Sequence, residues 1–375
     1  MTVLVSGLSG QLGHAIAGVT PARLIGLVRP SVGATRLRRR IESRQGAIEL
    51  VTGDISVKHW GVEEQVLERL AHEVTCVVNC AGSTDWMGTA ESLQTSNVAG
   101  AVHGVGFARR LSDISGRSIP YLHTSTTYVA GSAVGTVPET RLAAGGDRTR
   151  YEHFKWVGEE AVLRAARTLE VPVLIARFPA LLGDSTTGET LYKNSLYLLA
   201  ERWNDIPLGL LPAMHNARVD CMPRDKAAEI LLAVAEGLAA QAVPSGIEFV
   251  HIANGAQAPT LRALVEAGRM VDPYAFDRWI RIMPASRNQV VNASALGERF
   301  ARLDGRWQNA LIGLRYIGLD RIFDRSALRT ALDAHGKVAI PPVSLETAAR
   351  LTFGLDGIRE SISAPKHRPL ARFRA

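Results

Sequence analysis

Cysteine is scarce in this sequence: only Cys76, Cys80 and Cys221 occur, and they follow neither a paired nor a metal-ligand spacing. This scarcity argues against a disulfide framework, which a chain of 375 residues does not need because it can bury a large core without crosslinks. We therefore expect reduced thiols and a cytoplasmic protein. The histidines are not grouped with carboxylates or thiols in a metal-site pattern, so no bound metal is expected.

Long hydrophobic runs are also missing. No stretch approaches the ~18 consecutive apolar residues that a membrane-spanning helix requires. The most apolar segment, from Ala227 to Val243, carries Glu229 and Glu236 and predicts an amphipathic or buried helix. The amino terminus shows neither the basic start nor the cleavage site of a signal peptide. The sequence thus predicts a protein without a membrane span.

Acidic residues are fewer than basic ones, 36 against 43, and the formal net charge is +7. A basic balance can indicate nucleic acid, a membrane surface or an acidic partner. No nucleic-acid-binding module and no basic strip interleaved with aromatic residues is present, so we expect no nucleic acid as a partner. Part of the excess is local and lies in the arginines of residues 36–40 and in a basic tail, residues 366–375.

Short apolar runs alternate with helix-like stretches over the first ~180 residues, which predicts parallel β-α-β units. The fold class expected is α/β, a doubly wound parallel sheet (Rossmann) with a smaller, mostly helical C-terminal substrate domain. We expect a dinucleotide-binding domain over residues 1–185, to which some later segments return, and a substrate domain over residues 186–365. Beyond Pro179 only Phe249–Ile252 looks like a strand before the last third. The strands expected earlier are Val3–Val5, Arg23–Val28, Ala47–Val51, Val74–Val78, Pro120–His123 and Val171–Ile175, and the helices expected are Leu12–Val19, Val62–His72, Asn97–Leu111, Tyr151–Thr168, Ser195–Trp203, Asp225–Leu238 and Thr260–Ala267.

A glycine-rich turn follows the first strand, with Gly7, Gly10 and Gly13 in the spacing G-x-x-G-x-x-G before a helix. Glycine allows a tight turn and lets the backbone approach a pyrophosphate, and the helix N-terminus adds free N–H groups. Gln11 and Leu12 belong to the same loop. An ordinary β-α turn is the alternative interpretation, but the strand before and the helix after favour a dinucleotide site.

The second expected strand ends at Arg29, where an NAD-specific site would offer a carboxylate to the ribose 2′-hydroxyl. A guanidinium binds a 2′-phosphate in a bidentate manner, and Arg36 follows closely. We therefore predict NADPH/NADP+ as the cofactor; the alternative is that these arginines are only solvated. Asp54 ends the next strand, where it could accept from the adenine amino group, with Ile55 packed on the ring.

Tyr151 and Lys155 form the pattern Y-x-x-x-K, which places both side chains on one face of a helix. A neighbouring ammonium favours a phenolate and so lowers the pKa of a tyrosine, which makes proton exchange near neutral pH feasible. Hydroxyl side chains follow the strand Pro120–His123, and one of them can donate to a substrate carbonyl oxygen. The candidates are Thr126 and Ser125.

The order of these motifs resembles the extended short-chain dehydrogenase/reductases, and within them most closely the thioester reductase domains and the fatty acyl reductase (male-sterility, NAD-binding) family. The resemblance covers residues 1 to about 265 and is thin beyond. The matching stretches are Gly53–Ser56, Trp60–Val62, Leu67–Leu70, Asn79–Trp86, His123–Gly131, Tyr151–Glu159, Arg177–Gly188 and Met222–Asp225. The chain departs from the pattern at His153 and Phe154, where small residues are usual, and at Phe178, which separates Arg177 from Pro179.

The resemblance implies a catalytic set of Thr126, Tyr151 and Lys155. In this set Tyr151 donates the proton, Lys155 holds the ribose, and Thr126 polarises the carbonyl, with Ser125 as the runner-up. Asn97 would steady the active-site water or the helix, and Pro179 would lie beside the nicotinamide. The implied cofactor-binding residues are Gly7, Gly10, Gln11, Leu12, Gly13, Arg29, Arg36, Asp54, Ile55, Ala81, Asn97, Tyr151, Lys155 and Pro179.

The resemblance further implies an NADPH-dependent reductase that acts on an acyl thioester, carried by a carrier protein or coenzyme A, and forms an aldehyde or alcohol. Carrier proteins are generally acidic, which suits a basic chain. Three alternatives stay open: a ketoreductase or alcohol dehydrogenase for a free small molecule, a sugar-nucleotide epimerase or dehydratase, and a non-catalytic NADP sensor. We expect structural roles for Asp220 and Asp225, an ion pair for Glu159, and a place in the core or pocket wall for Trp86 and Trp156.

Overall fold

A seven-stranded sheet forms the centre of the computed structural model, which describes residues 1–19, 23–29, 48–201, 209–271, 281–299, 305–337 and 342–354. The strand order is β11-β7-β5-β4-β1-β2-β3, and all six neighbouring pairs are parallel. This confirms the predicted doubly wound fold, with the order reversing between β1 and β4. The strands are β1 (Thr2–Ser6), β2 (Arg23–Val28), β3 (Ile48–Thr52), β4 (Cys76–Asn79), β5 (Tyr121–Thr126), β7 (Val173–Phe178) and β11 (Phe249–His251).

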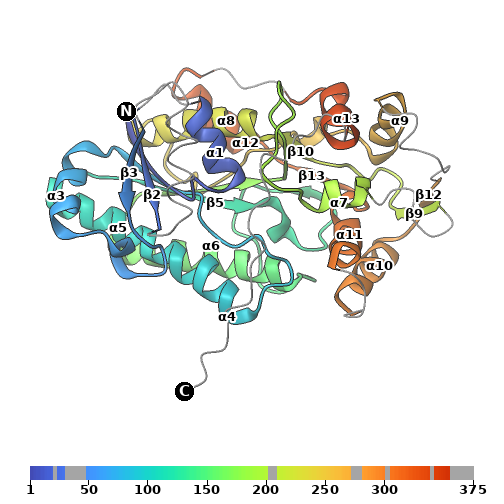
Figure 1. Ribbon diagram of the computed structural model, residues 1–375, viewed down its shortest axis with the longest axis horizontal. Helices are drawn as coiled ribbons and strands as arrows, with labels where there is room; N and C mark the ends of the chain where they lie inside the picture. The colour runs from blue at the N-terminus through green and yellow to red at the C-terminus, as the bar shows by residue number, and fades with distance from the viewer. Residues whose placement is uncertain are drawn as a thin grey trace.

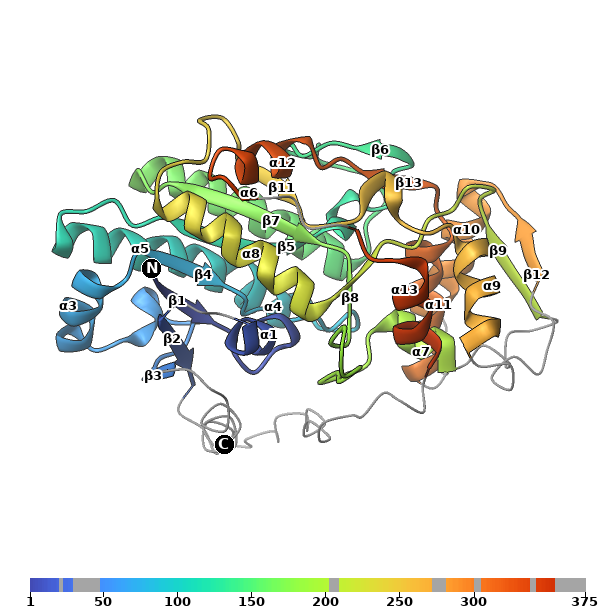
Figure 2. The same ribbon diagram turned by 90° about the horizontal axis from the view of Figure 1, so that it is seen from above.

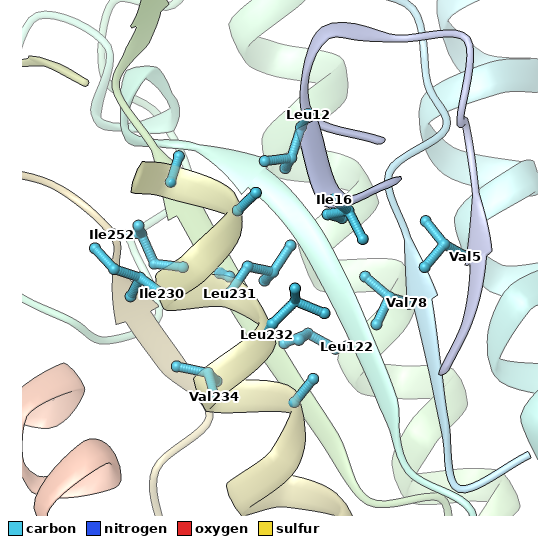
Figure 3. Close-up of a cluster of buried hydrophobic side chains, with 14 of the residues drawn as sticks. Val5, Leu12, Ile16, Val78, Leu122, Ile230, Leu231, Leu232, Val234 and Ile252 are labelled. Atoms are coloured by element: carbon cyan, nitrogen blue, oxygen red, sulfur yellow. The ribbon is translucent and has the colours of Figure 1, made fainter. Parts of the chain in front are cut away.

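Helices cover both faces of this sheet (Figure 1). One face carries α1 (Gln11–Val19), α8 (Arg224–Ala239) and α12 (Ser326–Asp333), and the other carries α3 (Glu64–Glu73), α5 (Gly100–Ser115) and α6 (Arg150–Leu169). Figure 3 shows the first of these cores, where side chains of α1 and α8 meet the sheet. Each fully buried Leu or Ile of such a core contributes roughly 1.5–3 kcal/mol. The labelled residues of this core are Val5, Leu12, Ile16, Val78, Leu122, Ile230, Leu231, Leu232, Val234 and Ile252.

A further apolar core lies at one end of the molecule, beyond the carboxyl edge of the sheet (Figure 2). Its members come from residues 180–353, so the later part of the chain contributes to both regions: α8, β11 and α12 pack on the sheet, while the intervening helices build this second core. The elements gathered at this end are α7 (Ser195–Glu201), β9 (Leu210–Ala213), α9 (Leu261–Val271), β12 (Arg281–Pro284), α10 (Arg287–Arg299), α11 (Gly305–Ile317) and α13 (Leu345–Phe353).

The structure corrects three expectations about elements. Phe249–Ile252 is not the only strand in the middle of the chain, because β8 (Ala180–Leu182) pairs with β10 (Cys221–Pro223), and β9 is also extended. Strands this short carry too few residues to show alternation. β5 continues three residues beyond the predicted end, because Thr126 still pairs with Phe178 of β7.

The third correction concerns the helix expected from Asn97. The chain is already helical at Ala90, through α4 (Ala90–Leu93) and a π-helical turn, Gln94–Ala99, that leads into α5. Thr89 caps α4 by accepting from the backbone N–H of Ser92 at 3.2 Å, which fixes this earlier start. Among the described residues, no helix is both long and apolar enough to cross a membrane.

Candidate active site

A cavity of ≈ 340 Å³ opens where the carboxyl ends of β1, β4, β5 and β7 meet the second core. Doubly wound folds bind their ligands at this edge, because the strand order reverses there. The three residues of the predicted catalytic set all line it. So do several of the predicted cofactor residues: Gly10, Gln11, Leu12, Ala81, Tyr151, Lys155 and Pro179.

The glycine turn after β1 packs backbone against backbone. Gly7 has a φ of +79°, and a Cβ on it would lie 2.6 Å from the Ala81 nitrogen. A Cβ on Gly13 would lie 2.3 Å from the Gly7 oxygen. Only glycine fits these positions, so the turn is tight and presents the N-terminus of α1 to the cavity. The residues present therefore fit the pyrophosphate of a dinucleotide.

Tyr151 owes its position to the way in which α6 begins. The Thr149 hydroxyl accepts from the backbone N–H of Glu152, and the Glu152 carboxylate accepts from the backbone N–H of Thr149 at 2.7 Å. This capping box fixes the first turn of α6. Tyr151 lies in that turn and Lys155 one turn later, so both face the cavity as their spacing predicts.

Electrostatics at Tyr151 differ from the sequence-based expectation. Burial raises the pKa of Tyr151, with smaller contributions in the same direction from Tyr192 and Glu152, while a hydrogen bond from Thr126 opposes the rise. The prediction that Lys155 lowers this pKa is therefore wrong for this structure. The Lys155 ammonium is directed elsewhere and donates to the Thr124 carbonyl at 3.0 Å. Tyr151 is thus a neutral phenol, suited to donating a proton.

Burial also acts on the lysine. Desolvation lowers the pKa of Lys155 to about 8, although Glu159 and Cys80 act in the opposite direction. The ammonium form is penalised because only 8% of the side chain is exposed. Lys155 is consequently a cation at neutral pH that loses its proton at mildly basic pH.

Two hydroxyls compete for the role of carbonyl donor. The Thr126 hydroxyl donates to the Phe178 carbonyl at 3.2 Å, accepts from the Tyr128 backbone N–H, and also hydrogen-bonds Tyr151, so its single proton has two possible acceptors. The Ser125 hydroxyl is buried and has no hydrogen-bond partner among the described residues. Both residues line the cavity. The contact with Tyr151 favours Thr126, because a donor must reach the same oxygen that the phenol protonates.

The remaining predicted cofactor residues do not line this cavity. Arg29 is exposed directly after β2, and Arg36 lies outside the described residues. The Asp54 carboxylate accepts from the Ser56 backbone N–H at 2.8 Å, and Ile55 packs against Gly100. Their contacts with a dinucleotide stay predictions.

Asn97 is buried in the π-helical turn and holds the loop after β4. Its side-chain oxygen accepts from the Ser83 backbone N–H at 2.8 Å, and its amide group donates to the Ser83 carbonyl at 3.0 Å. Ser83 lines the cavity, so Asn97 shapes the cavity wall through this loop. The sequence-based alternative of a helix-steadying role is closest to this arrangement.

The structural roles expected outside the site are confirmed. Glu159 forms a buried bidentate ion pair with Arg177. The Asp220 carboxylate accepts from the backbone N–H groups of Asn254 and Gly255, and that of Asp225 accepts from Ser185. The described residues hold no group of three potential metal ligands.

Sequence patterns missed the segment that closes the cavity opposite α6. Gln11 holds this segment, because its backbone N–H donates to the Tyr192 hydroxyl at 3.3 Å and its side-chain oxygen accepts from the Leu191 N–H at 2.9 Å. Tyr192 and Asn194 both line the cavity. Their partners lie some 180 residues away in the sequence, so no local motif could have identified them.

Comparisons with known proteins agree with this geometry. The NAD-binding family model described as "Male sterility protein" matches residues 24–231, more than half of the chain. A glycine betaine reductase of Emericella nidulans is 24% identical over 315 residues, which are 77% of this chain and 24% of that protein. An L-2-aminoadipate reductase of Schizosaccharomyces pombe is 28% identical over 261 residues, 62% of this chain and 18% of that protein. The chain thus spans about a quarter or less of the length of these relatives.

Solved structures share the fold. The terminal R domain of the myxalamid PKS-NRPS biosynthetic pathway superposes with a TM-score of 0.69 at 22% identity, over 95% of this chain and 90% of that domain. A thiolation-reductase di-domain of an archaeal non-ribosomal peptide synthetase gives a TM-score of 0.66 at 20% identity, over 95% of this chain and 75% of that one. Identities this low establish the common fold alone.

Proposed function

Because this chain belongs to the Male sterility protein family of extended short-chain dehydrogenase/reductases, we propose that it is an NADPH-dependent reductase of acyl thioesters. One observation carries the proposal: Tyr151, Lys155 and Thr126 converge with the glycine turn in a single cavity at the carboxyl edge of the sheet. A dinucleotide on the glycine turn and a carbonyl at Tyr151 would thus share one enclosed space.

Each residue has a role that follows from its contacts. Tyr151 donates its phenolic proton to the carbonyl oxygen, which Thr126 holds in place. Lys155 binds the ribose of the dinucleotide, and Gly7, Gly10 and Gly13 shape the turn for the pyrophosphate. When bound, NADPH supplies the hydride that adds to the carbonyl carbon. The reduced thioester carbon then releases the thiol and leaves an aldehyde, and a second round gives an alcohol.

The substrate class is inferred from the relatives and from charge. Similar chains are reductases, and one similar structure joins its reductase domain to a thiolation domain. We propose that an acyl group arrives on coenzyme A or on an acidic carrier protein, which the net charge of +7 suits. Residues 1–185, with later segments that return, would bind the dinucleotide, and residues 186–365 would shape the acyl site. The unpaired Cys76, Cys80 and Cys221 favour a cytoplasmic setting.

The test follows NADPH oxidation and thiol release in parallel. Acyl-coenzyme A esters of short, medium and long chain, the same acyl groups on a carrier protein, and a panel of ketones are offered as substrates. We expect NADPH oxidation with stoichiometric thiol release for thioesters, and loss of both in Tyr151→Phe. Oxidation with ketones alone would identify a ketoreductase instead. Unchanged turnover in Tyr151→Phe would overturn the catalytic assignment.

A further inference from the structure

The first turn of α6 receives a side chain from the far end of the sequence. Tyr316, near the end of α11, donates its hydroxyl to the Glu152 carboxylate at 2.7 Å, across 164 residues of chain. Glu152 is fully buried, and Tyr316 is 5% exposed. The other oxygen of the same carboxylate accepts from the Thr149 N–H. One carboxylate thus closes the turn that carries Tyr151 and also anchors α11.

The charge of Glu152 is balanced from the same C-terminal segment. The Arg315 guanidinium lies 3.6 Å from the carboxylate, and Arg321 also faces it. Arg321 in turn donates to the Arg315 carbonyl at 2.8 Å, which ties the two cations together. A buried carboxylate needs such partners, and a hydroxyl donor is the shortest contact that α11 makes with it.

A second path joins Tyr316 to Tyr151 through an aromatic ring. Trp86 stacks on Tyr151 with ring centroids 6.1 Å apart at 23°, and meets Tyr316 edge-on at 4.7 Å. Trp86 and Tyr151 both line the cavity, whereas Tyr316 lies behind them. The phenol of Tyr151 is therefore held on two sides, by its helix turn and by Trp86, and Tyr316 contacts both supports.

We propose that Tyr316 is a positioning residue for Tyr151, acting through the Glu152 carboxylate and the Trp86 ring. The proposal rests on the proposed function, in which Tyr151 delivers a proton. Proton transfer requires a donor and acceptor within hydrogen-bond reach, so a small displacement of the α6 turn slows the chemical step more than it weakens dinucleotide binding. The C-terminal region, where the family resemblance is thin, would thereby set the geometry of the catalytic phenol.

The variants separate the hydrogen bond from the ring. Tyr316→Phe keeps the contact with Trp86 but removes the donor, and Glu152→Gln removes the charge but keeps an acceptor for the Thr149 N–H. Tyr197→Phe is the matched control, because Tyr197 is a buried phenol of the second core that accepts from the Gly183 N–H at 2.6 Å and does not line the cavity. Each is measured for kcat, for KM with NADPH, and for amide hydrogen exchange over residues 149–155.

For Tyr316→Phe we expect kcat to fall about tenfold and KM for NADPH to stay within about twofold. Glu152→Gln should act similarly, and the double variant should be no slower than the slower single variant, because both remove one contact. Amides in the first turn of α6 should exchange about tenfold faster in Tyr316→Phe, and not in Tyr197→Phe. The exchange result does not depend on which substrate is turned over.

The outcomes distinguish the two proposals. Faster exchange with a lowered kcat supports both, and faster exchange in a protein that reduces no thioester supports the anchor while the thioester function fails. Unchanged exchange in Tyr316→Phe, or a fall in kcat matched by Tyr197→Phe, overturns the positioning role. If Tyr316→Phe does not fold, Glu152→Gln carries the same comparison.

Discussion

Arg177 and Glu159 form a bidentate ion pair between β7 and α6, with N–O distances of 3.0 and 2.8 Å and with neither side chain more than 1% exposed. The guanidinium also donates to the Thr140 carbonyl and lies over the Phe249 ring. This pair fixes the helix that carries Tyr151 against the sheet. Its contribution is best seen when one partner is removed, because the other charge is then left buried without compensation.

Glu159→Gln should therefore lower the free energy of unfolding by about 3–5 kcal/mol. Glu160→Gln provides a neighbouring control, because Glu160 pairs with Arg141, which is 58% exposed, and exposed pairs contribute roughly 0–1 kcal/mol. Chemical denaturation of both variants measures the difference. Equal losses in the two variants would contradict the importance assigned to the buried pair.

Thr126→Val should separate the two candidate hydroxyls. The Thr126 hydroxyl hydrogen-bonds Tyr151, whereas the Ser125 hydroxyl has no partner among the described residues. Loss of an oxyanion donor costs about 10²–10³ in kcat, so we expect a fall of this size in Thr126→Val. Ser125→Ala should retain most of the wild-type rate. Steady-state kinetics with one thioester substrate gives the comparison, and the reverse ranking would transfer the role to Ser125.

The features that the sequence predicted well are those encoded within a few neighbouring residues. The glycine turn, the spacing of Tyr151 and Lys155, and the bounds of β2 depend on local periodicity and on turn chemistry, which the chain displays directly. These features placed the site at the correct edge of the sheet. They also led to the family, which the match over residues 24–231 establishes.

Features that depend on tertiary contacts were not predictable in the same way. The bond between Tyr316 and Glu152 and the bond between Gln11 and Tyr192 join residues more than 160 positions apart. The raised pKa of Tyr151 likewise follows from burial, which no i, i+4 pattern reports. Residues beyond about 265 lacked a clear motif, and they supply Tyr316.

Lys155→Met should make the protein more stable while abolishing its function. The pKa of Lys155 is 10.5 when the lysine is unperturbed and about 8 in the folded protein. Between these values the unfolded state binds more protons, so the stability contribution rises with pH from 8 to 10.5; below 8 the cost is constant. At pH 7 that cost is roughly 3 kcal/mol, because one pKa unit corresponds to about 1.4 kcal/mol.

We therefore expect Lys155→Met to raise the free energy of unfolding at pH 7 by about 1–3 kcal/mol, with a smaller gain near pH 10. NADPH binding to the wild type should weaken as pH rises through about 8, since the ammonium is lost, and this dependence should vanish in the variant. Denaturation and fluorescence titration at several pH values measure both effects. A variant that is destabilised at pH 7 would refute the burial penalty.

Gly7→Ala should impair both folding and NADPH binding. The added Cβ would lie 2.6 Å from the Ala81 nitrogen, at a φ of +79° that disfavours alanine. We expect a loss of roughly 1–3 kcal/mol in the free energy of unfolding. Gly106→Ala is the control, because its Cβ meets nothing within 4 Å and it lies within α5, where alanine gains about 0.5–1 kcal/mol. Tight NADPH binding by Gly7→Ala would argue against the turn as the pyrophosphate site.

Arg29→Ala should weaken the preference for NADPH over NADH. Arg29 is exposed at the carboxyl end of β2, where the residue beside the adenosine ribose stands in doubly wound folds. A hydrogen bond to a charged group contributes about 1.5–3 kcal/mol, so the ratio of kcat/KM values for the two cofactors should fall roughly 10- to 100-fold. The change should come from NADPH alone, because NADH has no 2′-phosphate.

Arg23→Ala supplies the control at the other end of the same strand. Arg23 is also exposed, but it pairs with Glu49 and Glu73, far from the carboxyl edge that carries the cavity. Its loss removes the same formal charge, so any effect of net charge on the binding of anionic cofactors appears equally in both variants. If Arg23→Ala lowers the cofactor ratio as much as Arg29→Ala does, the preference reflects the overall field of the protein, and the assignment of Arg29 to the 2′-phosphate is wrong.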